Sequence, residues 1–125
     1  MLVAFRVLIV DDSQSFLEAA RGLLEREGVS VVGVASTIAE ALSQEAELRP
    51  EVVLVDITLG AESGFELARR LRETGSDGGS KVILVSTYAE ADFAELIAES
   101  PANGFLPKSQ LSAEAIGRLV GSARS

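Results

Sequence analysis

The strongest constraint on the fold is the alternation of short apolar runs with helical patterns along the whole chain. The apolar runs lie at residues 7–10, 29–35, 52–55, 82–85 and 105–106. After each run, apolar side chains recur at the three- and four-residue spacing of one helix face. These stripes are Phe16, Ala20, Leu23 and Leu24; Ile38, Ala41 and Leu42; Phe65, Ala68 and Leu71; Phe93, Leu96 and Ile97; and Ala115, Ile116, Leu119 and Val120. Strands that alternate with helices predict a parallel sheet covered by helices on both faces.

Local signals mark the ends of several elements. Ser13 is placed to cap the first helix and Gly28 to end it. Thr37 and Glu40 form a capping-box pattern at the start of the second helix. The stretch TGSDGGS at 74–80 has the composition of a mobile surface loop.

The number of units narrows the topology. Right-handed crossovers leave few arrangements for such a chain, and the strand order 2-1-3-4-5 fits five strands best. We therefore predict an α/β, flavodoxin-like, doubly wound parallel sheet with five helices. A length of 125 residues suits one domain over 1–125, with 121–125 as a tail or the start of a linker.

Residue types that the chain lacks exclude several kinds of chemistry. Without cysteine there is no disulfide framework, thiolate zinc site or cysteine nucleophile, and without histidine there is no Ser-His-Asp machinery. A formal net charge of −8 makes this segment a poor binder of nucleic acid. We read no signal peptide and no membrane segment at the start of the chain, so we expect a cytoplasmic protein with no membrane contact.

Polar side chains follow the apolar runs at the points where the predicted strands end. Ligands bind such sheets outside the carboxyl ends of the strands, at the point where strand order reverses, which here lies between the first and third strands. The strand ends deliver Asp11 and Asp12 (first), Asp56 (third), Ser86 and Thr87 (fourth), and Pro107 and Lys108 (fifth). The predicted edge strand ends in the uncharged Ala35 and Ser36. Topology therefore predicts that three carboxylates and a lysine share one crevice.

Three carboxylates in one crevice repel one another. A like-charged pair about 4 Å apart costs about 4 kcal/mol at an effective dielectric constant of about 20. Either the pKa values rise or a cation is bound, and a hard divalent cation such as Mg²⁺ suits carboxylate ligands. The site would then accept one more anionic group, such as a phosphoryl.

Taken singly, each of these residues has a simpler interpretation. Asp at a helix start often caps it, Asp at a strand end often forms a turn, and Ser at a strand end often caps the next helix. A lone lysine is usually solvated, and an aromatic residue such as Phe105 is usually part of the core. The combination of the acids in one crevice is what favours a metal site.

These segments resemble the receiver domains of two-component response regulators over nearly the whole chain. VLIVDDS (7–13) is similar to the family's first strand and acidic pair, and VVLVDITLGAESG (52–64) to its acceptor segment, with Asp56 as acceptor and Gly64 eight residues on. VILVSTYAE (82–90) is similar to the fourth strand with its switch hydroxyl, Ser86. NGFLPKS (103–109) is similar to the fifth strand with its lysine, Lys108, especially in receivers attached to helix-turn-helix DNA-binding domains.

The resemblance implies a signalling switch rather than an enzyme. A sensor histidine kinase, a histidine phosphotransfer protein or a small phosphodonor would phosphorylate Asp56, and Lys108 would pair with the phosphoryl oxygens. The Ser86 hydroxyl would then move to the phosphoryl and Phe105 would turn inward, remodelling the face of the fourth helix, fifth strand and fifth helix. Mg²⁺ (or Mn²⁺) would be held by Asp12 and Asp56 directly, by Asp11 through water, and by the backbone carbonyl of Thr58.

The resemblance also implies partners. Phosphorylation would favour a homodimer through the remodelled face. The segment would either act as a stand-alone receiver or be covalently linked to a DNA-binding output domain. The acyl phosphate would hydrolyse, which would reset the switch.

Two positions depart from the family pattern, and two others stand where family members set the rate of dephosphorylation. Gly60 replaces a frequent proline, so we expect a looser loop after Asp56. Ser109 replaces the proline that often follows the lysine, which removes a cis Lys-Pro bond and leaves Lys108 less rigidly placed. Thr58 and Tyr88 stand where family members tune dephosphorylation, and we predict that bulky Tyr88 hinders the attacking water.

Three alternative functions remain open at this point. A haloacid-dehalogenase-type phosphatase also uses an aspartate nucleophile and Mg²⁺, but its second acid would fall at Thr58. A receiver-like docking module would never be phosphorylated. A flavin or nucleotide binder of the same fold would need a glycine-rich phosphate cradle, which DDSQS (11–15) does not provide.

Overall fold

The computed structural model describes residues 5–74, 79–87 and 90–121. Its main sheet consists of β1 (Arg6–Val10), β2 (Ser30–Ala35), β3 (Val52–Asp56), β6 (Lys81–Ser86) and β7 (Gly104–Pro107). The strands are parallel and lie in the order β2-β1-β3-β6-β7. In terms of the five predicted strands this is the order 2-1-3-4-5, so the flavodoxin-like fold is confirmed.

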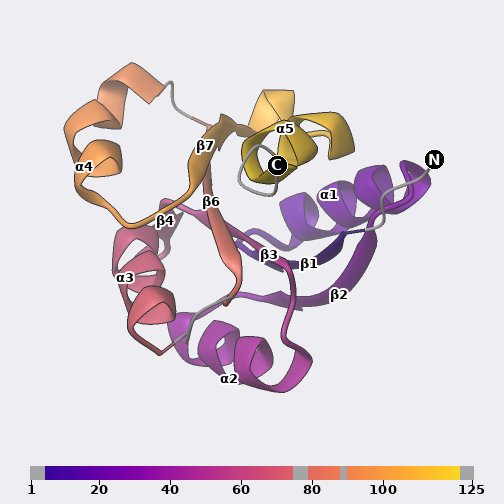
Figure 1. Cartoon of the computed structure of the whole chain (residues 1–125), viewed down its shortest axis with the longest axis horizontal. Helices are drawn as coiled ribbons and strands as arrows, with labels where there is room; N and C mark the ends of the chain where they lie inside the picture. Colours follow the sequence, from indigo (N-terminus) through magenta and orange to yellow (C-terminus); the bar gives the residue numbers. More distant parts are fainter. Residues whose placement is uncertain (1–4, 75–78, 88–89, 122–125) are drawn as a thin grey trace.

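Helices cover both faces of this sheet (Figure 1). The α-helices are α1 (Gln14–Arg26), α2 (Ile38–Leu48), α3 (Gly64–Thr74), α4 (Ala94–Glu99) and α5 (Ala113–Gly121). Two 3₁₀ turns, η1 (Glu90–Phe93) and η2 (Lys108–Gln110), precede α4 and α5. α1 and α5 lie on one side of the sheet, and α2 and α3 lie on the other (Figure 1).

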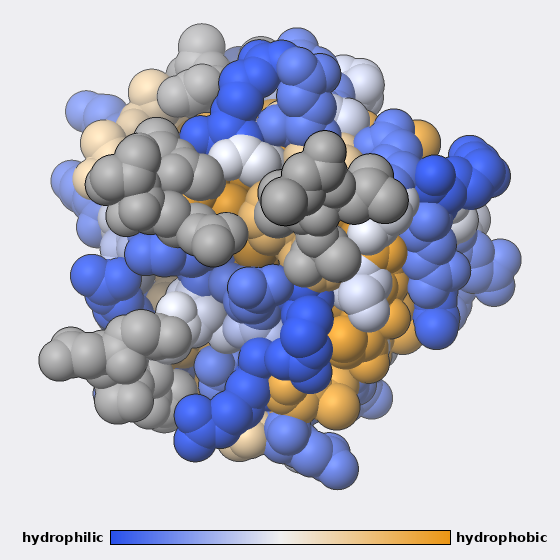
Figure 2. All heavy atoms as spheres, turned by 45° about the vertical axis from the view of Figure 1, so that its right-hand side comes forward, coloured by the Kyte–Doolittle hydropathy of each residue, from blue (hydrophilic) through white to orange (hydrophobic). Residues whose placement is uncertain are grey.

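The two faces have separate cores because side chains alternate along each strand. Val7 and Ile9 of β1 belong to the cluster under α1 and α5, with Leu24 and Ile116. Leu8 and Val10 belong to the cluster under α2 and α3, with Leu67. The edge strand β2 is less covered: its residues 32–34 are partly exposed, and the side of the molecule that carries α1 and β2 shows an apolar area bordered by hydrophilic residues (Figure 2).

The segment after Asp56 forms an unpredicted hairpin. β4 (Thr58–Leu59) pairs antiparallel with β5 (Glu62–Ser63). Gly60 opens the two-residue connection with φ 62°, a value that a proline ring does not allow. The glycine expected to loosen this loop therefore permits a tight turn, while the mobility of the turn stays a prediction.

The predicted stripe of the fourth helix is wrong at Leu96. That side chain is 51% exposed, whereas Phe93 and Ile97 are half-buried against the second core. A 3₁₀ turn has 3.0 residues per turn and α4 has only six residues, so the helical period is interrupted and too short to present a wide apolar face. In α1 and α3 the stripes shift slightly, because Leu17 and Leu67 are buried and Phe16, Leu23 and Phe65 are only partly so.

Two other predictions, a mobile loop over residues 74–80 and a tail or linker over 121–125, fall mostly outside the described residues. Within the ranges that are described, no helix is long and apolar enough to cross a membrane.

Candidate functional site

The acidic pair lies directly beyond β1. The Asp11 backbone N–H donates to the Ala35 carbonyl (3.0 Å), which extends the pairing with β2 by one step. Asp11 is fully buried, and its Oδ1 accepts a hydrogen bond from the Ser13 backbone N–H (2.8 Å), while Asp12 is exposed. The cap of α1 is Ser13, whose Oγ accepts from the Phe16 backbone N–H (3.3 Å). The two aspartates are therefore not needed as the N-cap of α1.

Asp56 is the last residue of β3. It is 7% exposed, and its Oδ1 accepts from the Thr58 backbone N–H (3.2 Å). The next residue, Ile57, donates its N–H to Val85 of β6 (3.0 Å) and accepts from the Gly64 N–H (2.7 Å). A Cβ at Gly64 would overlap the Asp56 carbonyl oxygen, so only glycine lets α3 begin this close to the acceptor segment.

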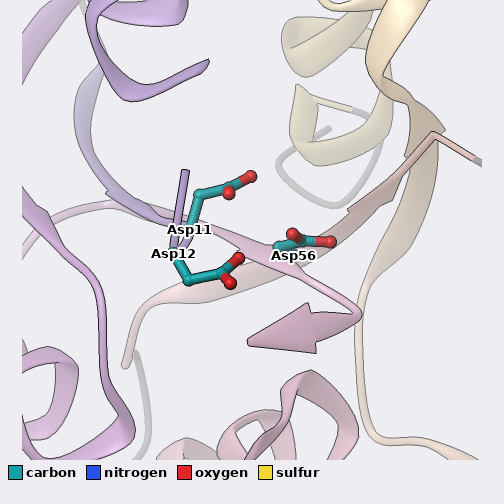
Figure 3. A group of neighbouring side chains, drawn as sticks. All are labelled: Asp11, Asp12 and Asp56. Atoms are coloured by element: carbon teal, nitrogen blue, oxygen red, sulfur yellow. The ribbon is translucent and has the colours of Figure 1, made fainter. Parts of the chain in front are cut away.

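The three carboxylates gather in one space beyond the strand ends (Figure 3). One oxygen from each of Asp11, Asp12 and Asp56 lies within 4.8 Å of the other two. The prediction that the ends of β1 and β3 bring these acids together is confirmed.

Lys108 adds one positive charge to this group. Its Nζ lies 2.6 Å from Asp11 Oδ2 and 3.4 Å from Asp56 Oδ2. The longer contact has hydrogen-bond geometry and the shorter one does not, so Asp11 Oδ2 is buried with an ion-pair partner but no hydrogen bond. One lysine facing three carboxylates leaves the site with an excess of negative charge.

This charge excess changes the acidity of Asp56. Burial, followed by repulsion from Asp11, raises the pKa of the Asp56 carboxyl from its ordinary value of 3.8 to about 6. The Thr58 N–H and the Lys108 ammonium act in the opposite direction but do not offset these effects. The Asp56 carboxyl therefore keeps its proton to a higher pH than an ordinary aspartate does.

The donor set fits a hard divalent cation. All three side chains offer carboxylate oxygens, and the buried Asp11 Oδ2 has the Lys108 ammonium as its only partner among the described residues. A cation among these oxygens would offset the repulsion that raises the Asp56 pKa. The three acids therefore form a candidate site for such a cation.

The other predicted site residues lie at the same edge of the sheet or beside it. Ser86 is buried at the end of β6, opposite Pro107 of β7. Phe105 is half-buried against the second core cluster, and its backbone pairs with Leu84. Thr58 is exposed at the start of the hairpin. Tyr88 lies outside the described residues.

One residue beside the site, Phe16, was not predicted from the sequence to lie there. The Phe16 ring lies against the Lys108 ammonium, with Nζ 4.2 Å from the ring centroid. The helical stripe of α1 predicts Phe16 only as an apolar residue, and a contact between residues so distant in the chain has no signal in a single sequence.

Comparison with known proteins identifies the family. The family described as the response regulator receiver domain matches residues 7–119. The chain belongs to this family, which consists of signalling modules rather than enzymes.

Individual relatives agree with this assignment. The chain is 33% identical over 112 residues to the response regulator GacA of Pseudomonas viridiflava, covering 89% of this chain and 51% of that protein. It is 35% identical over 116 residues to the response regulator MprA of Mycobacterium sp. strain KMS, covering 91% and 48%. A two-component response regulator of the LuxR family from Aurantimonas sp. SI85-9A1 has a similar structure, with a TM-score of 0.82 at 30% identity, covering 95% of this chain and 87% of that one. The chain thus spans about half the length of the curated relatives that it matches.

Proposed function

We propose that this domain is a phosphorylation-dependent switch whose acceptor is the Asp56 carboxylate. A histidine kinase or a histidine phosphotransfer protein supplies the phosphoryl group, and a small phosphodonor serves in its place in vitro. Asp11, Asp12, Asp56 and the Thr58 carbonyl hold Mg²⁺ or Mn²⁺, and the acyl phosphate later hydrolyses to reset the domain.

The observation that carries this proposal is the meeting of three carboxylates within 4.8 Å at the sheet edge, with a single lysine beside them. Such a group is costly for folding unless a charged ligand is bound. A bound divalent cation supplies neutralisation of charge on both the carboxylates and the incoming phosphoryl group.

The surroundings of Asp56 support its role as the nucleophile. The Thr58 N–H fixes Oδ1, and Lys108 lies near Oδ2, so the carboxylate is oriented from both sides. Lys108 is 15% exposed, which leaves its ammonium partly shielded from water and close enough to pair with a phosphoryl on Asp56. Positioning and charge neutralisation are the main requirements of phosphoryl transfer.

The response of the domain is proposed to pass through Ser86 and Phe105. Ser86 lies on β6, which borders the acceptor strand β3, and Phe105 lies on β7, the next strand beyond β6. The Ser86 hydroxyl moves to the phosphoryl, and the half-buried Phe105 then turns inward. This changes the face formed by α4, β7 and α5, through which the domain acts on an output partner or dimerises.

The test is intact mass after incubation with acetyl phosphate and Mg²⁺. Wild type should gain one phosphoryl group, Asp56→Asn should gain none, and removal of Mg²⁺ with EDTA should prevent the gain. Asp92→Asn is the matched control, because Asp92 is an exposed aspartate on η1. That variant should be phosphorylated like wild type.

Two results would contradict the proposal. A phosphoryl gain that persists in Asp56→Asn would place the acceptor elsewhere. No gain in wild type, either from acetyl phosphate or from a panel of histidine kinases, would favour a docking module. The phosphatase alternative has no support at Thr58, where its second acid would be required.

Tyr88 is proposed to lengthen the phosphorylated lifetime by hindering the attacking water. Tyr88→Ala should then lose its phosphoryl group faster than wild type, as measured by the decay of phosphorylated mass after the donor is removed. An unchanged decay rate would remove this role.

The remaining proposals concern assembly. Because the chain matches about half of a putative transcriptional regulator of Pseudomonas aeruginosa, we propose that it acts with a DNA-binding output domain. Sedimentation with and without phosphorylation tests the proposed dimer, and monomers in both states would exclude it.

A further inference from the structure

We infer that Phe16 is a positioning residue: its ring holds the Lys108 ammonium beside Asp11 and Asp56. This inference deepens the proposed function, because it assigns a residue that prepares Lys108 for the phosphoryl group. It rests on the contact between the Phe16 ring and Lys108 Nζ, 4.2 Å from the ring centroid. A cation at this distance from the face of an aromatic ring is attracted by the ring's quadrupole.

Lys108 needs such support because its backbone fixes the Cα but not the ammonium at the end of a long, flexible side chain. The next residue is the exposed Ser109, and Lys108 itself begins the three-residue turn η2. A lysine side chain has several rotatable bonds and a point charge without directional preference. The place of Nζ is therefore decided by the groups that surround the ammonium.

The two carboxylates alone are an unreliable support. Asp11 and Asp56 hold Nζ at 2.6 and 3.4 Å, but both also belong to the group of oxygens that a cation would share. A cation competes with Lys108 for these charges. The Phe16 ring carries no charge and offers no ligand oxygen, so its attraction for Nζ persists when the carboxylates have other partners.

The ring itself is well anchored. Phe16 lies in the first turn of α1, where its backbone N–H donates to the Ser13 cap. Its side chain packs against the core cluster that includes Leu17 and Leu111. The Leu111 N–H in turn donates to the Lys108 carbonyl (3.3 Å), so the ring and the lysine backbone are tied to the same core.

The contact can be observed directly, without phosphorylation. The chain has only two lysines, Lys81 and Lys108, so lysine-selective isotope labelling gives two sets of side-chain NMR signals. The ring should shift the Lys108 Hε signals upfield of those of Lys81. This difference should largely vanish in Phe16→Leu and persist in Phe16→Tyr.

The functional test is the rate of phosphorylation by acetyl phosphate with Mg²⁺. Phe16→Leu should slow it about three- to tenfold, the factor expected for loss of one partly buried cation–π contact. Phe16→Tyr, which keeps the ring, should restore most of the rate. Phe65→Leu is the matched control on the opposite face of the sheet and should leave the rate unchanged, because Phe65 packs against Phe93 rather than near Lys108.

A double-mutant cycle separates positioning from packing. In a Lys108→Ala background, Phe16→Leu should slow phosphorylation no further, since the residue through which it acts is gone. An equal slowing in both backgrounds would overturn the inference, as would a wild-type rate in Phe16→Leu. If Phe16→Leu is poorly folded, Phe16→Met takes its place in the cycle.

The inference and the proposed function fail in different ways. If wild type is not phosphorylated at all, the proposed function fails, and the NMR measurement still decides whether the ring holds Lys108. If wild type is phosphorylated but its Lys108 signals show no ring shift, the positioning role is wrong and the proposed function stands.

Discussion

The first and fourth helices follow parallel strands that end at the same edge of the sheet, but the two helices are packed and capped very differently. α1 has 13 residues, a side-chain cap at Ser13, and Leu17, Ala20 and Leu24 buried beneath it. α4 has six residues, no side-chain cap hydrogen bond at its start, and no buried residue. Its Leu96 is half exposed. The acidic pair therefore precedes a firmly packed helix, and the end of β6 leads to a weakly packed one.

This difference suggests how the domain divides its tasks. A charged site must be held in place, because its energy depends strongly on distance. An element that changes on signalling should have low local stability, which follows from few buried apolar contacts. α1 and the site are the part that must be held in place, and η1 with α4 is the part of low local stability.

The same substitution in the two helices tests the comparison most strongly. Leu24→Ala removes a fully buried side chain of α1 and should lower the free energy of unfolding by about 2–5 kcal/mol. Leu96→Ala in α4 should change it by no more than about 0.5 kcal/mol. Urea denaturation measures both. A large loss for Leu96→Ala would show that α4 is as well packed as α1.

The next effect comes from Asp56, at the centre of the acidic site. Because its pKa is raised to about 6, the folded protein keeps a proton that the unfolded chain has already released. Without divalent cation, the free energy of unfolding should fall as pH rises from about 4 to about 6, and stay lower above that range. Asp56→Asn should remove this fall and stabilise the protein at pH 7 by up to about 3 kcal/mol. Thermal unfolding in EDTA at several pH values is the measurement.

Added Mg²⁺ provides the control for this prediction. It should stabilise wild type more than Asp56→Asn, because the variant has lost one ligand and one charge. If wild-type stability rises with pH over the same range, the assignment of a raised Asp56 pKa is wrong.

The cap of α1 should have a smaller effect. Ser13→Ala removes the acceptor of the Phe16 N–H and should cost about 1 kcal/mol of folding stability. Ser13→Asp, which keeps an acceptor, should cost less in the metal-loaded protein. A neutral result for Ser13→Ala would mean that α1 is held by packing alone, and the contrast with α4 would then rest only on buried area.

The smallest predicted effect concerns the acceptor hairpin and α2. Glu62 Oε1 accepts a hydrogen bond from the Ile38 N–H in the first turn of α2 (2.9 Å). Glu62→Gln should destabilise by about 0.3–1 kcal/mol, since a negative charge at a helix N-terminus is favourable. Glu47→Gln, near the other end of α2, should have the opposite sign. Equal effects of the two variants in chemical denaturation would exclude the helix dipole as the cause.

Much of this architecture is predictable from the sequence, and the exceptions have physical reasons. The order of the main strands and the meeting of Asp11, Asp12, Asp56 and Lys108 follow from alternating elements and from the rule that ligands bind at strand ends. The β4–β5 hairpin was missed because two-residue strands show no periodicity. Its one signal is Gly60 before Ala61, the glycine-first pair of a tight hairpin turn.

Two further details depend on tertiary structure. Leu96 has the right spacing for a buried helix face, but the 3₁₀ turn before α4 and the shortness of that helix leave it exposed. The contact of Phe16 with Lys108 depends on where η2 places the lysine, which a local pattern does not specify.

The pairing of α1 with α5 also has a consequence for synthesis on the ribosome. Glu27, at the end of α1, accepts a hydrogen bond from the Ala113 N–H at the start of α5 (2.6 Å), and both helices cover one core. The side chains of α1 that face this core are made early, and Ile116 and Val120 are made last. Until α5 emerges from the exit tunnel, that core stays open to water and to passing chaperones. Pausing of translation just before residue 113 should therefore prolong the aggregation-prone state more than a pause within α2.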